Sequence, residues 1–278
     1  MCVFDYELFS FNARGINGKL KRNMLFNHLK RKSDKGIFLL QETHSCLDSE
    51  LEWKREWGGE AFFSHCTTQS AGVAILFSPG LNVTFKEEPT NHPGRTQFIK
   101  INTGDPDNET LIVNVYAPTR NMVIEQITFL DKLKQQINSI DFVHLITGGD
   151  WNTIFDPKLD KQGGTLTNCM NEYTSNLKNF IEIYELVDVI RLFNPDRKLF
   201  TRVQRTPLIF TRLDHWLVSE HLCNLITGCK VQPGIKSDHS IIQLNLDTKQ
   251  NYRGKGFWKF NSSLLHDPDY VKKNQRSC

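Results

Sequence analysis

Short apolar runs recur along the chain, and most are rich in β-branched or aromatic residues and bounded by Gly, Pro, Asn or Asp. Such runs are typical of β-strands. They cover residues 7–11, 36–41, 73–78, 98–101, 111–116, 142–147, 199–203, 208–218 and 240–246.

Three other segments repeat apolar residues at the spacing of an α-helix. These stripes are Leu20, Met24, Leu25 and Leu29; Ile127, Leu130, Leu133 and Ile137; and Tyr173, Leu177, Phe180, Ile181 and Tyr184. Many strands with a few helices between them predict a layered α/β domain, in which two packed sheets are flanked by helices.

Two stretches interrupt this pattern. Residues 156–170 carry little helix or strand signal and predict a long surface loop, which is a kind of segment that is often functional. Residues 145–154, LITGGDWNTI, lead from an apolar run into two glycines. They predict a tight turn at Gly148 and Gly149, with Trp151 pointing into the core.

The composition is that of an ordinary soluble globular protein, with 278 residues of which 39% are hydrophobic and 23% charged. The seven cysteines include no C-x-x-C pair, so neither a zinc site nor a disulfide framework is indicated. The N-terminus lacks the layout of a signal peptide, and every apolar run is too short to cross a bilayer. We therefore expect an intracellular protein that is neither secreted nor bound to a membrane.

The net charge of +3 is unevenly placed. Residues 251–278 carry six Lys/Arg against two Asp, a local balance of +4, which leaves −1 for residues 1–250. Any nucleic-acid-binding surface must therefore be local. Two basic stretches, residues 19–35 and 197–212, are candidates, although a solvated face is the commoner explanation of such a stretch.

Polar residues stand at or near the ends of several predicted strands, where the loops of a layered sheet protein converge on its ligand. Carboxylates gathered there repel one another unless a cation or a proton compensates. Oxygen ligands of this kind suit Mg²⁺ or Mn²⁺ rather than zinc. The candidates are Asn12, Glu42, Tyr116, Asp150, Asn152, Asp214, Asp238 and His239.

Each candidate also has an ordinary structural explanation. Glu42 fits a turn or a helix start, Asn12 fits a side-chain cap, and Tyr116 fits a half-buried strand end. Asp214 fits an internal structural acid, and Asp238 together with His239 fits a cap of the last strand. These alternatives stay open for single residues, but their recurrence at successive strand ends favours one shared site.

The segments SFNARG, LLQETH, NVYAP, GGDWN, RLDHW and SDHS occur in this order. Together they resemble the motif series of the exonuclease–endonuclease–phosphatase superfamily, and within it the apurinic-endonuclease-like domain of LINE-type (non-LTR) retrotransposons. The resemblance spans residues 7 to about 246 and implies a four-layer α/β/β/α sandwich of two packed mixed sheets flanked by helices. The segment GKGFWKFNSSLL is similar to the one that joins this endonuclease to a reverse transcriptase. It implies an endonuclease domain over residues 1–246 and a basic linker over residues 247–278.

The resemblance also implies a role for each candidate residue. Glu42 would be the main ligand of Mg²⁺, for which Mn²⁺ could substitute, and Asn12 and Asp238 would assist it. Asp150 would orient or deprotonate the attacking water, and Asn152 would donate a hydrogen bond to the phosphate. In-line attack on a phosphodiester needs such charge neutralisation and a positioned water.

The remaining implied roles concern the phosphate and the leaving group. His239, oriented by Asp214, would bind the scissile phosphate, and Tyr116 would donate to the phosphate or lie near the leaving oxygen. Two positions depart from the pattern. Arg14 stands where many relatives have an acid or amide, and Lys161 stands where a number of them have Arg, which loses the bidentate fork.

DNA contacts are expected around a hairpin with its tip at residues 204–207. The resemblance implies that this hairpin probes the minor groove, where arginine reads groove width and deformability more than base identity. The candidate DNA-contacting residues are Arg14, Lys161, Thr201, Arg202, Arg205 and Thr211, and Arg191, Arg197 and Arg212 lie near the same hairpin in the sequence.

The resulting hypothesis is a magnesium-dependent endonuclease that nicks one strand of double-stranded DNA. The 3′-hydroxyl so formed would prime reverse transcription of the element's RNA by the reverse transcriptase of the same polyprotein, in the nucleus after transit through the cytoplasm. Two alternatives are a cellular apurinic-site endonuclease or related phosphodiesterase, and a catalytically inactive nucleic-acid-binding module. The complete polar set argues against the inactive module.

Overall fold

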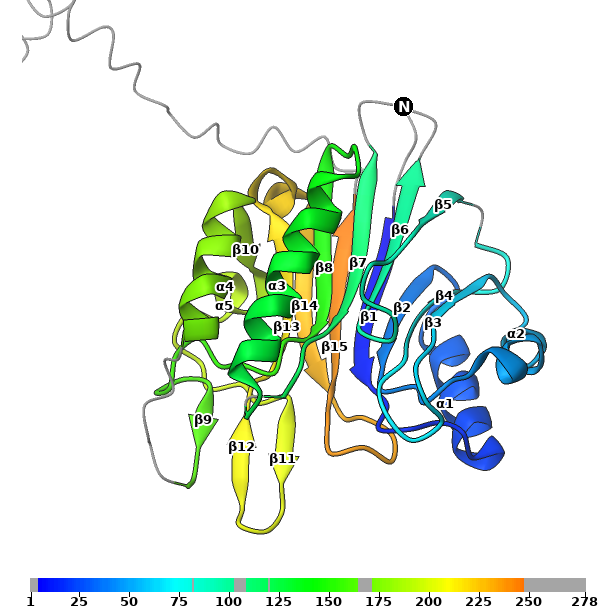
Figure 1. The fold of residues 1–278 in the computed structure, drawn as a ribbon, viewed down its shortest axis with the longest axis horizontal. Coiled ribbons are helices and arrows are strands. Elements are labelled where there is room, and N and C mark those ends of the chain that lie inside the picture. Colours follow the sequence, from blue (N-terminus) through cyan, green and yellow to red (C-terminus); the bar gives the residue numbers. More distant parts are fainter. Residues whose placement is uncertain (1–4, 82, 103–108, 120, 165–171, 248–278) are drawn as a thin grey trace, which may run out of the picture.

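The computed structural model describes residues 5–247 apart from residues 82, 103–108, 120 and 165–171. Two six-stranded sheets pack face to face, and helices cover both outer faces (Figure 1). The result is the α/β/β/α sandwich that the sequence predicts. Within the described residues, no helix is long and apolar enough to cross a membrane.

The first sheet has β1 and β2 as parallel neighbours, and its other pairs are antiparallel. Two helices cover its outer face, α1 (Lys19–Lys32) and α2 (Glu50–Trp57). In spatial order its strands are β14 (Ile226–Gln232), β15 (Ile241–Asp247), β1 (Asp5–Asn12), β2 (Gly36–Gln41), β4 (Val73–Phe77) and β3 (Ala61–Ser64).

The second sheet is built in the same way, with β7 and β8 as its parallel pair. Its outer face is covered by α3 (Val123–Asn138) and α4 (Glu172–Ile183), while the short α5 (Val189–Phe193) follows its edge strand β10. In spatial order its strands are β10 (Leu186–Asp188), β13 (Asp214–Ser219), β8 (His144–Asp150), β7 (Thr110–Tyr116), β6 (Thr96–Asn102) and β5 (Thr84–Glu88).

A small third sheet extends beyond one end of the sandwich (Figure 1). It consists of the hairpin β11 (Arg202–Gln204) and β12 (Ile209–Thr211), with β9 (Lys161–Gln162) along the outer side of β12. The hairpin predicted near residues 204–207 is therefore present, with its turn at residues 205–208. The short 3₁₀ helices Leu47–Ser49 and Glu220–Leu225 complete the described elements.

The two-residue period of the strands divides the core into layers. Leu8 of β1 and Ile37 of β2 lie in the cluster between the sheets, whereas their neighbours Phe9 and Phe38 lie in the cluster under α1 and α2. A third cluster fills the space between the second sheet and the helices α3 and α4. Trp151 is fully buried in this third cluster, which confirms that it points into the core.

The predicted turn at Gly148 and Gly149 is wrong, because both residues belong to strand β8. A Cβ on Gly148 would lie 2.1 Å from the ring of Trp216, and one on Gly149 would lie 1.9 Å from the carbonyl oxygen of Val115. Gly149 also has a φ of +150°. The glycines therefore allow close approach between neighbouring strands rather than reversal of the chain.

The run at residues 208–218 is not one strand. It forms β12 and β13, which belong to different sheets and are separated by Arg212 and Leu213. Arg212 is fully buried, and its ion pairs with Asp160 and Asp188 compensate the buried charge. Asp160 lies in the segment predicted to be a surface loop and is itself fully buried, whereas Lys158 and residues 162–164 are exposed as predicted. Residues 165–170 lie outside the described residues.

Helix α1 turns a different face to the core from the one predicted. Leu25 and Leu29 are buried, but Leu20 is 71% exposed and Met24 41% exposed. Phe26 completes the buried face. Helix α2 and strands β3, β5 and β14 were not predicted. The three strands are short or have few apolar residues, whereas α2 has a signal in its two buried tryptophans, Trp53 and Trp57.

Candidate active site

The parallel pairs bring functional side chains to one end of the sandwich. Asn12 ends β1, Glu42 follows β2, Tyr116 ends β7 and Asp150 ends β8. Parallel neighbours finish at the same edge of a sheet, and the two sheets are packed face to face, so these four residues meet. The antiparallel β13 begins there with Asp214, directly opposite Asp150.

Asn12 joins the two sheets. Its Nδ2 donates to Oε1 of Glu42 at 3.2 Å and to Oδ2 of Asp150 at 2.9 Å. The hydroxyl of Tyr116 donates to the same Glu42 oxygen at 2.6 Å. Asn152, whose backbone N–H donates to Oδ1 of Asp150 at 3.0 Å, holds that carboxylate from the other side. A hydrogen-bonded chain therefore fixes the two carboxylates relative to each other.

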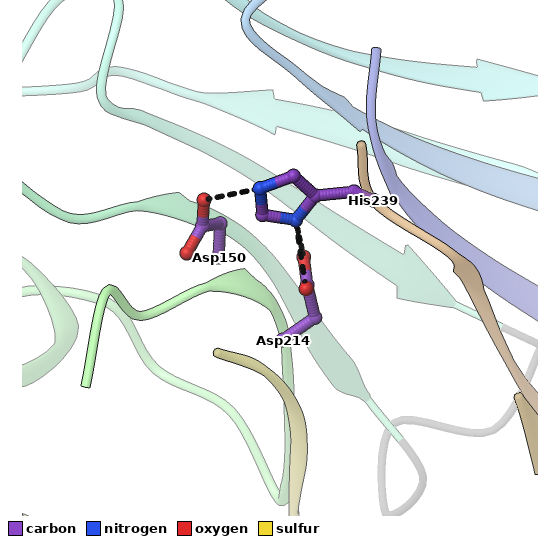
Figure 2. A group of neighbouring side chains, drawn as sticks. All are labelled: Asp150, Asp214 and His239. Atoms are coloured by element: carbon purple, nitrogen blue, oxygen red, sulfur yellow. Dashed lines mark hydrogen bonds and ion pairs between the residues drawn. The ribbon is translucent and has the colours of Figure 1, made fainter. Parts of the chain in front are cut away.

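His239 lies between two aspartates (Figure 2). Its Nδ1 is 2.9 Å from Oδ2 of Asp214, and its Nε2 is 3.8 Å from Oδ2 of Asp150. Burial by itself disfavours a charged imidazole, but the carboxylates of Asp214, Asp150 and Asp238 outweigh it and raise the pKa of His239 to about 9. At neutral pH the ring is therefore an imidazolium.

Asp150 responds to its surroundings in the opposite sense. Burial, and after it the negative charge of Asp214, raise the pKa of Asp150 to about 7, although His239 and Asn12 act against the rise. A carboxyl group with this pKa exchanges protons near neutral pH, which is what a general acid or base needs. Burial and Glu42 also raise the pKa of Tyr116, so its phenol stays protonated and donates.

The backbone around the site is in an uncommon conformation. Arg14, Glu42 and Asn152 have φ values of 50°, 50° and 49°, in the left-handed region that residues other than glycine rarely adopt. Such strained positions cluster at functional sites, where the surrounding structure holds them. Backbone hydrogen bonds between the loops hold these residues in this conformation. For example, the Gly15 N–H donates to the Glu42 carbonyl at 2.6 Å.

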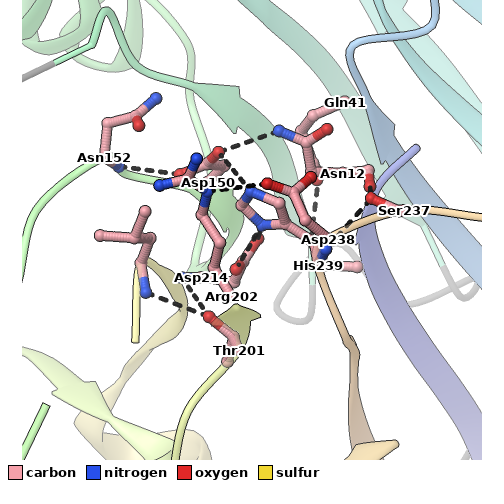
Figure 3. A network of polar contacts seen from close by, with 12 residues as sticks. Asn12, Gln41, Asp150, Asn152, Thr201, Arg202, Asp214, Ser237, Asp238 and His239 are labelled. Atoms are coloured by element: carbon pink, nitrogen blue, oxygen red, sulfur yellow. Dashed lines mark hydrogen bonds and ion pairs between the residues drawn. The ribbon is translucent and has the colours of Figure 1, made fainter. Parts of the chain in front are cut away.

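An open cavity of about 560 Å³ lies over these groups. Most of the residues predicted from the sequence contribute to its lining, and five of them, Asp150, Asn152, Arg202, Asp238 and His239, are labelled in Figure 3 with some of their polar partners. The lining includes Arg14, Glu42, Tyr116, Asp150, Asn152, Lys161, Arg202, Thr211, Asp238 and His239. Asn12 and Asp214 are buried behind it, in contact with Glu42 and His239, and Arg205 lines an adjoining groove.

Asp238 enters the cavity between two arginines. Its Oδ1 is 3.3 Å from Nη1 of Arg14, and its Oδ2 accepts a hydrogen bond from Nε of Arg202 at 3.0 Å. Burial opposes the charged form, but His239 and both arginines lower the pKa of Asp238. The carboxylate is therefore ionised across the physiological range.

The donor set fits a hard divalent cation. Glu42, Asp150 and Asp238 present carboxylate oxygens to one cavity, which is the ligand type that Mg²⁺ prefers. Among the described residues, Asp150, Asp214 and His239 also have ligand atoms within 4.8 Å of one another. Both ring nitrogens of His239 face carboxylates, an arrangement that suits a protonated imidazole better than a metal-bound neutral one.

The structure corrects one predicted DNA-contacting residue. Thr201 is fully buried, and its hydroxyl accepts hydrogen bonds from the backbone N–H groups of Leu213 and Asp214 at 3.0 and 3.1 Å. It therefore holds the start of β13 and does not face the cavity. Two of the nearby arginines are also occupied internally, because Arg191 and Arg212 both pair with Asp160.

Sequence reasoning missed several residues of the site. Ser237 donates its hydroxyl to the Asn12 carbonyl at 2.8 Å and accepts the backbone N–H of His239, so it ties the two loops together. The guanidinium of Arg95 lies 4.7 Å from the ring centre of Tyr116. Ser237 had a local signal, its place in the SDHS segment, whereas Arg95 is distant in sequence and had none.

Known proteins resemble this chain in sequence and in fold. The model of the endonuclease/exonuclease/phosphatase family matches residues 9–239. A curated relative, the transposon TX1 uncharacterized 149 kDa protein of Xenopus laevis, is 30% identical over 267 residues, which are 95% of this chain. The chain spans 20% of the length of that relative.

Two solved structures share the fold. The AP endonuclease LMAP of Leishmania major has a TM-score of 0.75 at 17% identity, over 87% of this chain and 88% of its own. The endonuclease domain of TRAS1, a telomere-specific non-LTR retrotransposon, has a TM-score of 0.63 at 16% identity, over 89% of this chain and 100% of its own. At these identities the likeness concerns the fold.

Proposed function

Because this chain belongs to the endonuclease/exonuclease/phosphatase family, we propose that it is a magnesium-dependent endonuclease that nicks one strand of double-stranded DNA. The observation that carries the proposal is the set Asn12, Glu42, Asp150 and His239, which is hydrogen-bonded or ion-paired across both sheets beneath one open cavity. An inactive binding module would not need a carboxyl and an imidazole with strongly altered pKa values in one site.

The reaction is hydrolysis of a phosphodiester. The oxygen of a water molecule bonds to phosphorus, the bond from phosphorus to the 3′ oxygen breaks, and that oxygen takes up a proton from solvent and leaves as the 3′-hydroxyl. Asp150, whose pKa is raised to about 7, accepts a proton from the attacking water at Oδ1 or Oδ2. The imidazolium of His239 donates its Nε2–H to a phosphate oxygen and stabilises the negative charge that grows there, while Asp214 holds the ring through Nδ1. Asn152 and Tyr116 line the same cavity and position the phosphate.

Glu42 would hold a divalent cation, and Asn12 and Asp238 would be its further ligands. When bound, Mg²⁺ would polarise the phosphate and neutralise its charge, and Mn²⁺ would supply the same chemistry. Glu42 itself is already oriented by Asn12 and Tyr116, which donate to its Oε1. The arrangement therefore keeps one carboxylate in a fixed position for the cation.

The biological role that we propose is target-primed reverse transcription in a non-LTR retrotransposon. Its support is the similarity to a transposon protein about five times longer than this chain, which is consistent with a domain of a polyprotein. On this proposal residues 1–246 are the nuclease and residues 247–278 link it to a reverse transcriptase. The enzyme would act on nuclear DNA, and its 3′-hydroxyl product would prime copying of the element's RNA.

Nicking of supercoiled plasmid in the presence of Mg²⁺ tests the enzymatic proposal. Wild type should convert the plasmid to the open-circular form, and Glu42→Ala and His239→Ala should each slow the conversion by about 10²-fold or more. Glu60→Ala is the matched control, because Glu60 is an exposed acid between α2 and β3. Equal nicking by wild type and both site variants would refute the assignment.

A second pair of substrates separates the two enzyme hypotheses. A duplex with one abasic site and the intact duplex of the same sequence are cut side by side. We expect comparable nicking of both, because a transposon nuclease must cut undamaged target DNA. Cutting confined to the abasic duplex would identify an apurinic-site endonuclease instead, and the 3′-hydroxyl is checked by primer extension from the nick.

A further inference from the structure

Asp238 is enclosed by positive charge. Both of its carboxylate oxygens have a guanidinium partner, Arg14 at Oδ1 and Arg202 at Oδ2, and Figure 3 shows Arg202 beside Asp238 and His239. Lys21 contributes indirectly, because its Nζ donates to the carbonyls of Ala13 and Arg14 and so fixes the loop that carries Arg14. One arginine of the two ion pairs is held by the loop after β1, and the other belongs to strand β11.

The same three residues stand between two cavities. Arg14, Arg202 and Asp238 line the active-site cavity and also an adjoining groove of about 520 Å³. The groove adds Arg205 and the exposed Lys236, and Asp238 is the acidic residue of its lining. The groove is thus basic and suited to a nucleic-acid phosphate, while the active-site cavity is rich in carboxylates and suited to a cation.

A divalent cation and the two arginines have conflicting demands on Asp238. A cation that binds this carboxylate takes an oxygen that a guanidinium already occupies, and it is repelled by both guanidinium charges. A DNA phosphate resolves the conflict, because it offers the arginines oxygens with a matching geometry and leaves the carboxylate to the cation.

We propose that Arg14 and Arg202 compete with the divalent cation for Asp238, and that this competition couples metal binding to DNA binding. The inference rests on the proposed function for the identity of the phosphate ligand. The competition itself is a property of the protein and the cation. By thermodynamic linkage, DNA raises the affinity for the cation by the same factor as the cation raises the affinity for DNA, and typical couplings are about 5- to 150-fold.

Calorimetric titration of the DNA-free protein with Mg²⁺ tests the competition. Arg14→Ala and Arg202→Ala should each bind Mg²⁺ several-fold more tightly than wild type. Arg55→Ala, which removes an exposed arginine from α2, should bind it like wild type. The Arg14→Ala variant should fold like wild type, because this side chain is 63% exposed and its removal leaves the core intact. Its Mg²⁺ affinity is therefore the decisive measurement.

The coupling is measured by fluorescence anisotropy with a labelled DNA duplex, in Ca²⁺ to slow cleavage and in EDTA. Wild type should bind the duplex more tightly with the cation than without it. The double variant Arg14→Ala/Arg202→Ala should bind DNA more weakly in both conditions and should lose most of the difference between them. A merely structural role would lower both affinities, whereas competition predicts tighter metal and weaker DNA binding.

Unchanged or weaker Mg²⁺ binding by Arg14→Ala and Arg202→Ala would overturn the proposal, and so would a full cation effect on DNA binding in the double variant. These outcomes are independent of the nuclease assay. A wild-type protein that fails to nick plasmid refutes the proposed function, but the Mg²⁺ affinities still decide whether the arginines compete for Asp238.

Discussion

At the scale of single residues, the neighbours of each titratable group in the site determine its protonation state. His239 is buried, which alone would keep its ring neutral, yet Asp214 and Asp150 hold it as an imidazolium. Burial, and after it the nearby charge of Asp214, raise the pKa of Asp150 and favour its neutral acid form. One carboxylate, Asp214, therefore promotes the charged form of the imidazole and the protonated form of the second carboxyl group.

Substituting Asp214→Asn should lower the pKa of His239, because the carboxylate that raises it most is removed. If the imidazolium is the active form, activity is present below the pKa of His239 and is lost as pH rises through it. The variant should therefore lose activity at a lower pH than wild type, in which the loss should occur near pH 9, the pKa of His239. At pH 7 we expect a fall in kcat on the order of 10²-fold. Nicking rates from pH 6 to 9.5 give both values, and parallel profiles would contradict this explanation.

A second residue-scale feature is the buried cation Arg212. It pairs with Asp160 at 2.8 Å and with Asp188 at 2.7 Å. Burial opposes the ionised acids, but Arg212 outweighs it and lowers the pKa of Asp160, and it lowers that of Asp188 to about 2. Acids with lowered pKa values stabilise the fold fully above about pH 4, and the contribution is lost as pH falls toward 2.

Replacing Arg212→Met should destabilise the protein by about 3–5 kcal/mol at pH 7, because Asp188 loses its guanidinium partner and Asp160 keeps only Arg191. The deficit relative to wild type should shrink as pH falls, since the unpaired acids are then protonated. Urea unfolding at pH 7 and pH 4.5 measures both effects. Lys19→Met is the control, because Lys19 pairs with Glu52 at the surface, where both side chains are more than half exposed, and the pair should matter little. A deficit that is equal at both pH values would argue against the ion pairs.

At the scale of elements, strand β8 is shaped so that it delivers Asp150 to the site. Its last residues are Gly148, Gly149 and Asp150, and they pair with β7 on one side and β13 on the other. Side chains at the two glycine positions would collide with Trp216 and with the backbone of Val115. The glycines therefore let the strand lie close to its neighbours just before the carboxylate.

Gly149→Ala should cost roughly 2–4 kcal/mol of stability, because the added Cβ meets backbone rather than a movable side chain and φ is unfavourable. Gly228→Ala in β14 is the matched control, since nothing lies within 4 Å of the added atom. Thermal melts of the two variants make the comparison. Equal melting temperatures would show that β8 can shift away from β7 at little cost.

The β11–β12 hairpin is the element best placed to contact DNA beside the cavity. Its turn carries the exposed Arg205, and its base is tied to the catalytic loop, because Val203 N–H donates to the Asp238 carbonyl at 2.9 Å. On the proposed function, the hairpin would contact DNA beside the cut while its base stays fixed to Asp238.

Arg205→Ala should weaken duplex binding or change the preferred cleavage positions, and it should leave the Mg²⁺ dependence of nicking unchanged. The reason is that Arg205 lines the adjoining groove and not the cavity over His239. Mapping of nicks on a labelled duplex, with Arg55→Ala alongside, measures the effect. An identical cutting pattern and affinity would exclude a role of this arginine in recognition.

At the scale of the whole molecule, the fold depends on its last described strand. β15 lies between β14 and β1 in the first sheet and pairs with both. Its Ile242 and Leu244 are part of the core between the sheets. The described fold therefore requires the chain through β15.

A chain that ends after residue 247 should fold with the melting temperature of the full chain and should keep its nicking activity. A chain that ends after residue 240 should fail to fold, because β1 and β14 lose their common partner and the core loses β15. Circular dichroism melts of both truncations test the proposed domain of residues 1–246. A markedly lower melting temperature of the longer truncation would place the boundary further along the chain.

The sequence by itself determined what depends on local pattern. Short apolar runs rich in β-branched and aromatic residues located most central strands, the helical stripes located α3 and α4, and ordered motifs pointed to the residues that line the cavity. Trp53 and Trp57, spaced four residues apart ahead of Gly58, were an available signal for α2. These features are legible because periodicity and motif chemistry are carried by neighbouring residues.

Only the tertiary structure decided what depends on residues far apart in the chain. It showed Gly148 and Gly149 as points of strand contact, Thr201 as an internal support, and Arg212 as a buried counterion. It also placed Arg14 and Arg202 on the two oxygens of Asp238. A side chain's charge state and its freedom to bind a ligand depend on burial and on distant partners, and these are fixed only when the two sheets pack together.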